Sequence, residues 1–229
     1  MDFAKALGWS VTPLYILLGC FVLGIALLFF RRTRRPASYC LLLVTGTYVV
    51  FGLPVVANAI AGGLPSAPRL HREDEPIDTL VVFDGDNRRG RLAVTLQVLK
   101  ARPPKSLWIV GDEWLVEELQ HAGYPRTTFG QNRIATNTRE QMDWVRRFLT
   151  ENPERAVAIV VSRLQAPRVA SLADKLRLSV TLLPSPIDDE PPTAGWRAWA
   201  PSYVGFRASR DAIYEHVALW HYRRNGWID

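Results

Sequence analysis

Residues 79–112 read TLVVFDGDNRRGRLAVTLQVLKARPPKSLWIVGD, and this stretch decides the fold class. Two short apolar runs, 79–84 and 106–112, flank an amphipathic segment at 89–101 that is typical of a helix. Strands with Val, Ile and Leu at nearly every position are typical of a parallel sheet, because helices cover both of its faces. The stretch therefore predicts a strand–helix–strand unit with parallel strands.

The same alternation continues toward the C-terminus. It predicts further strands at 156–162 and 179–184, and further helices at 114–123, 138–149, 167–177 and about 209–224. A proline-rich stretch after Pro184 is expected to wrap the surface before the last helix. We therefore predict an α/β fold, a Rossmann-like three-layer domain with a parallel sheet, over residues 79–229.

Local signals mark several helices of this domain. Asn137 with Glu140 three residues later is a capping box, and Pro167 suits a first helical position. The last helix is expected to place one apolar face on the domain, formed by Ile213, Val217 and Trp220.

The first 64 residues follow a different pattern, because two long apolar runs occupy them. The run at 13–30 holds 18 residues without a charge, and the run at 39–64 contains Pro54, which predicts a bend. A helix needs about 20 apolar residues to cross the roughly 30 Å hydrocarbon core of a bilayer. We expect an N-terminal two-helix transmembrane hairpin in the lipid bilayer. A cleaved signal peptide is disfavoured because no small-residue cleavage site follows the first run, and two buried helices of a soluble bundle because neither run has a polar face.

The loop between the two runs gives the hairpin a direction. Residues 31–38 read RRTRRPAS, and the positive-inside rule places such a loop in the cytoplasm. Residues 65–78 hold three prolines and mixed charges, which is typical of a linker. We expect a multi-pass protein of the bacterial inner (cytoplasmic) membrane with its soluble domain in the periplasm or outside.

The charge distribution disfavours a nucleic-acid partner. Residues 1–65 hold five basic and one acidic residue, a net charge of +4, whereas residues 66–229 hold 23 basic and 21 acidic, a net charge of +2. A nucleic-acid protein needs its basic excess on the soluble face that meets phosphates. Cys20 and Cys40 both lie in the apolar runs, so no disulfide joins parts of the soluble domain.

Candidate functional residues follow the predicted strands, because ligands of open parallel sheets bind outside the carboxyl ends of strands. Carboxylates after the first two strands suit a divalent cation or acid/base chemistry, and they also suit simple turns. Residues 162–168 lead from a strand into a helix whose N-terminal amides favour an anion, with Arg168 one turn inside. No serine triad and no zinc site is expected. The residues after the first two strands are Asp84, Gly85, Asp86, Asn87, Gly111, Asp112 and Glu113.

Taken in order, these pieces resemble the ElyC/SanA/YdcF family. The resemblance covers roughly residues 78–229 and rests on motifs at 81–86, 91–92, 110–112, 137–140, 162–168 and 215–227. It implies an envelope protein with a Rossmann-like domain, associated with barrier integrity, peptidoglycan and surface polysaccharide. Its ligand would be a lipid-linked sugar or a phosphate-bearing precursor, and its protein partners would be envelope or polysaccharide assembly proteins.

The resemblance also implies a set of site residues. It makes Glu140 a possible base and Ser162 a second catalytic residue, with the arginines as anion clamps, because a guanidinium fork suits phosphate oxygens. The sequence departs from the family pattern, since a glycine-rich turn is replaced by Asp84-Gly85-Asp86 and a histidine before Pro167-Arg168 is missing. No metal is expected and no cofactor is identified. The predicted ligand-binding residues are Asp84, Asp86, Arg91, Gly111, Asp112, Asn137, Thr138 and Arg168.

Three functions remain open from the sequence. The first is an envelope biogenesis factor whose outer domain binds or processes a phosphorylated or sugar-containing precursor. The second is a non-catalytic partner in polysaccharide synthesis or export. The third is a magnesium-dependent phosphatase of haloacid-dehalogenase type, suggested by the order of FDGD at 83–86, Ser162, Lys175 and Asp188-Asp189.

Overall fold

The computed structural model of the chain describes residues 13–67, 69–72, 75–85, 87–111, 113–132, 135 and 137–229. The chain divides into two units. We call Met1–Gly62 with Pro191–Asp211 the hairpin unit, and Gly63–Glu190 with Ala212–Asp229 the sheet unit. The sequence-based division differs in two segments, because it joined residues 191–211 to the soluble domain and treated 65–78 as a separate linker after a hairpin that ended at residue 64.

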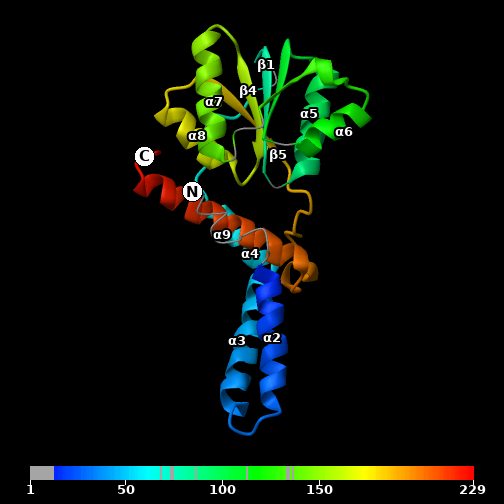
Figure 1. The fold of residues 1–229 in the computed structure, drawn as a ribbon, viewed down its shortest axis with the longest axis vertical. Helices are drawn as coiled ribbons and strands as arrows, with labels where there is room; N and C mark the ends of the chain where they lie inside the picture. Colours follow the sequence, from blue (N-terminus) through cyan, green and yellow to red (C-terminus); the bar gives the residue numbers. More distant parts are fainter. Residues whose placement is uncertain are drawn as a thin grey trace. The chain divides into compact units, whose positions relative to one another are not determined.

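Five parallel strands form the centre of the sheet unit (Figure 1). Their order is β3-β2-β1-β4-β5, so the strand order reverses at β1, which pairs with β2 on one side and β4 on the other. The predicted α/β class with a parallel sheet is confirmed. The strands are β1 (Thr79–Phe83), β2 (Ser106–Val110), β3 (Gly130–Asn132), β4 (Val157–Ser162) and β5 (Val180–Ser185).

Two apolar layers cover the sheet because successive side chains of its buried strands point to opposite faces. In β1, Leu80 and Val82 pack with α5 (Arg88–Ala101) and α6 (Glu113–His121). Val81 and Phe83 belong to the layer on the other face, where α7 (Thr138–Glu151), α8 (Ala166–Lys175) and the end of α9 (Tyr203–Arg224) pack. Figure 1 shows α5 and α6 on one side of the sheet and α7 and α8 on the other.

Two elements differ from the sequence prediction. Strand β3 follows the short 3₁₀ helix η1 (Arg126–Thr128) and has three residues, Gly-Gln-Asn. It contains no apolar run, so the sequence pattern did not predict it. Helix α9 begins at Tyr203 rather than near 209, and its predicted apolar face is wrong: Val217 and Trp220 are exposed, whereas Leu219 and Tyr222 are buried. The buried face contains Glu215, and this charge concealed the helical period.

Residues 69–71 of the predicted linker at 65–78 are fixed to the edge of the sheet. Leu70 forms a parallel bridge to Leu182 of β5, and the N–H of His71 donates to the Leu182 carbonyl at 2.8 Å. Arg69 pairs with Asp174 of α8 at 2.6 Å. The segment therefore covers part of an edge strand that would otherwise leave its backbone groups exposed.

In the hairpin unit, α2 (Pro13–Leu28) and α3 (Arg34–Gly52) pack through small side chains. A Cβ at Gly24 would lie 2.9 Å from Leu41, and Ala37 is buried beside it. The arginine turn closes the hairpin, because the Thr33 hydroxyl donates to the Leu27 carbonyl at 2.6 Å and Arg34 Nε donates to Leu28 at 3.0 Å. These bonds satisfy carbonyls at the end of α2 that have no partner within the helix.

The bend predicted at Pro54 is confirmed. Helix α3 ends at Gly52, and α4 (Pro54–Gly62) departs from it at 66°. Because of this break, the predicted span at 39–64 is two helices. Helix α3 also begins earlier than predicted, at Arg34 within the predicted loop 31–38. No single helix in the described part of the chain has both the length and the apolar composition to cross a bilayer, while α3 and α4 together meet both criteria. The transmembrane hairpin therefore stays a prediction.

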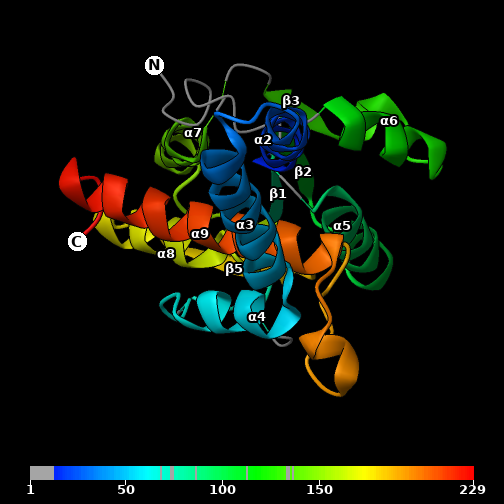
Figure 2. The same ribbon diagram turned by 90° about the horizontal axis from the view of Figure 1, so that it is seen from below.

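The segment at 191–211 completes the hairpin unit and includes the 3₁₀ helix η2 (Trp196–Trp199). The N–H of Ser202 donates to the Gly52 carbonyl at 2.9 Å, and Asn58 Nδ2 donates to the Pro192 carbonyl at 3.4 Å. Seen from below in Figure 2, the orange segment that contains η2 lies close to α4, with which it is in contact.

Candidate functional site

A cluster of buried polar side chains lies at the carboxyl ends of β1 and β4, where the strand order reverses. Ligands of open α/β sheets commonly bind at such a point, because the chain diverges there in two directions. The side chains come from α5, α7, β4, the start of α8 and α9, and each is less than a tenth exposed. They are Arg91, Thr138, Ser162, Gln165, Arg168 and Glu215.

Arg168 and Glu215 form a two-pronged ion pair in this cluster. Arg168 Nε and Nη2 donate to the two carboxylate oxygens of Glu215, each at 2.8 Å, and the rings of Tyr214 and Tyr222 lie 5.9 and 5.4 Å from the guanidinium carbon. Burial by itself lowers the pKa of Arg168, but the charge and hydrogen bonds of Glu215 outweigh burial and raise that pKa above its ordinary value. Arg168 therefore stays charged, and Glu215 neutralises the charge that the sequence reading assigned to an anion clamp.

Thr138 is the point where α7 and α8 meet. Its Oγ1 accepts hydrogen bonds from Arg168 Nη1 at 2.7 Å and from Gln165 Nε2 at 3.0 Å. A hydroxyl has two acceptor lone pairs and one hydrogen, so both lone pairs are filled and the hydrogen must be donated elsewhere. Among the described residues, no acceptor takes this hydrogen.

Ser162, at the end of β4, is also a buried hydroxyl that accepts a hydrogen bond. Its Oγ accepts the backbone N–H of Gln165 at 3.2 Å. Within the described parts of the chain, no carboxylate or imidazole is hydrogen-bonded to this oxygen. An activated serine nucleophile has such a base beside it, and the catalytic role of Ser162 stays a prediction.

Arg91 lies beneath the loop that follows β1. Its Nη1 donates to the Phe83 carbonyl at 2.8 Å, and the same atom would lie 3.0 Å from a Cβ at Gly85. Gly85 has φ of 146°, and its N–H donates to Asp84 Oδ1 at 2.7 Å. A glycine is therefore needed here both for its φ and for the close approach of the arginine.

The N-terminus of α5, where a Rossmann-like fold binds a dinucleotide pyrophosphate, is filled by the chain itself. Asp188 accepts the N–H of Gly90 at 2.6 Å and that of Arg89 at 3.3 Å. Asn87 in turn accepts the N–H of Asp188 at 3.2 Å and has a left-handed φ of 62°. A dinucleotide is excluded from these amides, and Asp188 acts as a cap rather than as the metal-binding acid of the phosphatase hypothesis.

The other predicted residues have mainly local roles. Asn137 caps α7 by accepting the N–H of Glu140 at 2.9 Å, as predicted, and the Glu140 side chain is exposed. A Cβ at Gly111 would lie 2.8 Å from that of Asp84, so this glycine lets the ends of β1 and β2 approach. Asp86 and Asp112 lie outside the described residues.

Three buried polar residues at this end of the sheet were not singled out from the sequence. Gln165 lies inside the motif at 162–168, and Glu215 was seen only as the first residue of a C-terminal motif. Gln141 Nε2 donates to the Val110 carbonyl at 3.2 Å, while its buried Oε1 has no hydrogen-bond partner among the described residues. One signal in the sequence could have identified Glu215. It lies at helical spacing between the apolar residues Ala212 and Leu219, so it falls on the buried face of the last helix.

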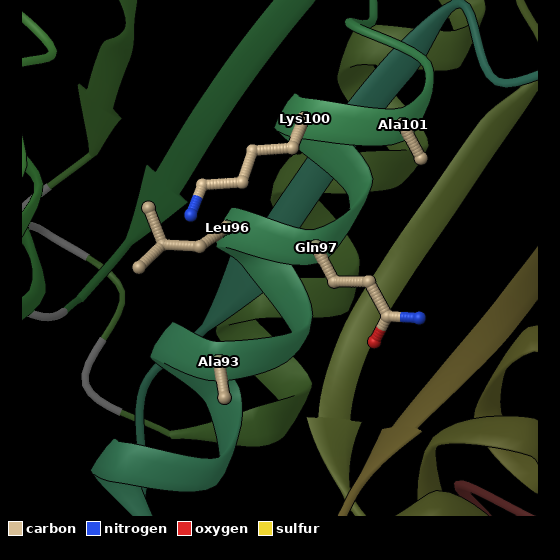
Figure 3. Close-up of a pocket in the computed structure, with 5 residues that line it drawn as sticks. All are labelled: Ala93, Leu96, Gln97, Lys100 and Ala101. Carbon is tan, nitrogen blue, oxygen red and sulfur yellow. The ribbon is translucent and has the colours of Figure 1, made fainter.

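Neither a metal site nor the surface hollow along α5 adds to this cluster. The described residues contain no group of three His, Cys, Asp or Glu side chains that would hold a metal ion. A hollow of about 590 Å³ lies along α5, but its side chains point to different sides of the helix and do not converge (Figure 3). It is lined by Ala93, Leu96, Gln97, Lys100 and Ala101.

Comparisons with protein-family models, with curated proteins and with solved structures gave no match.

Proposed function

We propose that the chain is a membrane-anchored cell-envelope biogenesis factor of ElyC/SanA/YdcF type whose sheet unit binds a phosphorylated or sugar-containing envelope precursor. In this proposal the precursor belongs to peptidoglycan or exopolysaccharide synthesis. The observation that carries it is the buried cluster of Thr138, Ser162, Gln165 and the Arg168–Glu215 pair at the point where the strand order reverses.

The cluster favours a ligand rich in hydrogen-bond acceptors. Thr138 has both lone pairs filled, so its remaining capacity is that of a donor, and Ser162 also keeps its hydrogen. Glu215 neutralises Arg168, and Arg91 Nη1 donates to the Phe83 carbonyl below the loop after β1. Hydroxyl, carbonyl and phosphoryl oxygens of a sugar phosphate complement such donors.

The anchor is supported by the surface of the hairpin unit. Leu23 and Leu42 are 59% and 70% exposed, and most of the large exposed apolar side chains in the described chain lie between residues 16 and 50. An apolar surface of this extent is unfavourable in water and suits a lipid environment. The arginines at 31–35 orient this hairpin with its turn in the cytoplasm and the sheet unit on the outer side of the inner membrane.

A binding role without turnover, as a partner in polysaccharide synthesis or export, is the second candidate. The observation that favours it is the environment of Ser162, which has no general base bonded to it among the described residues. The exposed Glu140 has its N–H bonded to the cap of α7, and the histidine of the family pattern is missing.

Calorimetry on the full chain in detergent tests the proposed ligand class. The probes are UDP-N-acetylglucosamine, N-acetylglucosamine and inorganic phosphate. We expect the nucleotide sugar to bind and Thr138→Val to weaken it about tenfold, the equivalent of one lost hydrogen bond of about 1.4 kcal/mol. Thr138→Ser keeps the hydroxyl and should keep the affinity.

A matched control lies at the opposite end of the sheet. Ser106 and Thr79 share a hydrogen bond of 2.8 Å at the amino ends of β2 and β1. Ser106→Ala therefore removes a hydroxyl from the same sheet without touching the polar cluster and should bind as the wild type does. Failure of every probe to bind, or equal affinity in wild type and Thr138→Val, contradicts the proposal.

A further inference from the structure

Three exposed aromatic side chains gather in the C-terminal part of the hairpin unit. Trp196, Trp199 and Tyr203 are 75%, 68% and 51% exposed, and they lie on η2 and at the start of α9. We call these three residues the aromatic collar. Large aromatic rings are normally buried, so three exposed rings within eight residues of sequence indicate a surface that meets something other than water.

Contacts within the hairpin unit hold the collar at one end of α3. The N–H of Ser202, between Trp199 and Tyr203, donates to the Gly52 carbonyl at 2.9 Å. Gly205 packs so closely that a Cβ there would overlap the same carbonyl oxygen, and the rings of Tyr48 and Phe206 lie 5.8 Å apart. The collar is therefore fixed beside the last turn of α3.

The length of α3 sets the distance between the collar and the arginine turn. Helix α3 has 19 residues from Arg34 to Gly52, and a rise of about 1.5 Å per residue makes it about 28 Å long. The hydrocarbon core of a bilayer is about 30 Å thick. If Arg34 and Arg35 lie at the cytoplasmic interface, the end at Gly52 lies at the opposite one.

The bend after α3 agrees with this depth. Helix α4 departs from α3 at 66°. It therefore turns toward the plane of the membrane at the point where α3 has crossed the thickness of the hydrocarbon core. Helix η2, with two of the collar residues, packs on α4. Trp and Tyr are enriched at membrane interfaces because the ring enters the acyl boundary while its N–H or O–H meets water and headgroups.

We propose that the aromatic collar inserts into the headgroup region of the outer leaflet, as a second membrane contact contributed by the C-terminal part of the chain. The inference rests on the proposed hairpin anchor. Arg197 lies between the two tryptophans, with its guanidinium 5.7 Å from the Trp196 ring, and it supplies a positive charge that complements lipid phosphates. The collar would fix the depth and rotation of the hairpin unit in the bilayer.

Tryptophan fluorescence of the full chain in phosphatidylcholine–phosphatidylglycerol nanodiscs tests the proposal. Lipids brominated near the headgroup or near the chain end quench tryptophans at those two depths. The chain has eight tryptophans, so the contribution of the collar is the difference between wild type and Trp196→Phe/Trp199→Phe. We expect the double variant to lose quenching by the shallow bromines and to keep quenching by the deep ones.

The control is Trp144→Phe, because the Trp144 ring packs against Trp108 and Phe148 at centroid distances of 5.1 and 5.5 Å inside the sheet unit. This variant should leave lipid quenching unchanged. Equal shallow quenching in wild type and double variant, or a collar contribution that comes from the deep bromines, overturns the collar proposal.

Alkaline carbonate extraction separates this failure from failure of the anchor. A wild-type chain that stays in the membrane but shows no quenching of the collar contradicts only the second contact. A wild-type chain that is released by carbonate contradicts the hairpin anchor, and with it the proposed function.

Discussion

The ion pair of Arg168 and Glu215 joins α8 to α9 in the interior of the sheet unit, where both side chains are less than a tenth exposed. Removing one partner leaves the other charge buried without compensation, which costs about 3–5 kcal/mol. We expect Glu215→Gln to destabilise the sheet unit by this amount in denaturant unfolding of the full chain followed by near-UV circular dichroism.

The exposed pair of Arg69 and Asp174 is the control for this variant. Asp174 is half exposed, and exposed pairs contribute about 0–1 kcal/mol. Asp174→Asn should therefore have little effect. A cost for Glu215→Gln as small as that of Asp174→Asn would show that the buried pair contributes no more than a surface contact.

Asp78 makes stability depend on pH at the amino end of β1. A hydrogen bond from Lys105 at 2.6 Å and one from the N–H of Ala156 at 3.1 Å lower the pKa of Asp78. A carboxyl whose folded pKa is lowered stabilises the fold above its unfolded pKa, about 3.9, and loses this contribution as pH falls through the folded value.

The stability difference between wild type and Asp78→Asn should therefore be largest at neutral pH, begin to fall near the unfolded pKa of about 3.9, and lose its charge-dependent part only below the folded pKa. Thermal unfolding of both proteins across this pH range measures it. A difference that is independent of pH would mean that the ionisation of Asp78 does not contribute to stability, and would contradict the prediction.

Single residues were predictable where their partners are near in sequence. Asn137 was predicted as a cap because its partner, Glu140, is three residues away. Glu215 is 47 residues from Arg168, and Asp188 is 98 from Gly90, so no local pattern links them. For this reason Arg168 was correctly predicted to lie after β4, but its ion pair with Glu215 was not predicted.

At the scale of elements, β1 and β4 could be predicted from the sequence because both of their faces are buried. Every residue in them is buried, and all are apolar except Thr79 and Ser162. The edge strand β3 has no such signal, because it pairs only with β2 and over three residues. The predicted starts of α7 and α8 agree with the structure to within one residue, because side-chain caps and prolines act locally.

The contact between α9 and the end of α3 depends on a glycine. Any Cβ at Gly205 would overlap the Gly52 carbonyl, so Gly205→Ala should force the two segments apart at a cost of about 1–3 kcal/mol. Thermal unfolding in detergent measures the effect on the hairpin unit.

Gly46 provides the control within α3, because a Cβ there would meet nothing within 4 Å. Gly46→Ala should be neutral or stabilise the helix by about 0.5–1 kcal/mol. Equal effects of the two substitutions would mean that the close approach at Gly205 is relieved without cost.

At the scale of the whole molecule, the proposed orientation makes opposite predictions for two fusion points. Alkaline phosphatase fused after Leu64 should be active, because this enzyme matures outside the cytoplasm, and a fluorescent protein fused after Thr33 should mature inside. The controls are the reversed fusions, alkaline phosphatase after Thr33 and the fluorescent protein after Leu64. Both should be inactive when they are expressed at the same level. Cytoplasmic reporter activity after Leu64 would reverse the orientation and contradict an outer site.

The division of the chain into units determines how the sheet unit is tethered. The chain passes between the units three times, at Gly62–Gly63, at Glu190–Pro191 and within α9 at Asp211–Ala212. A protease that cuts once near residue 65 leaves the sheet unit covalently joined to residues 191–211, which keep their hydrogen bond to Gly52. This cleavage alone therefore does not separate the two units covalently, and complete covalent separation requires cuts at all three crossings.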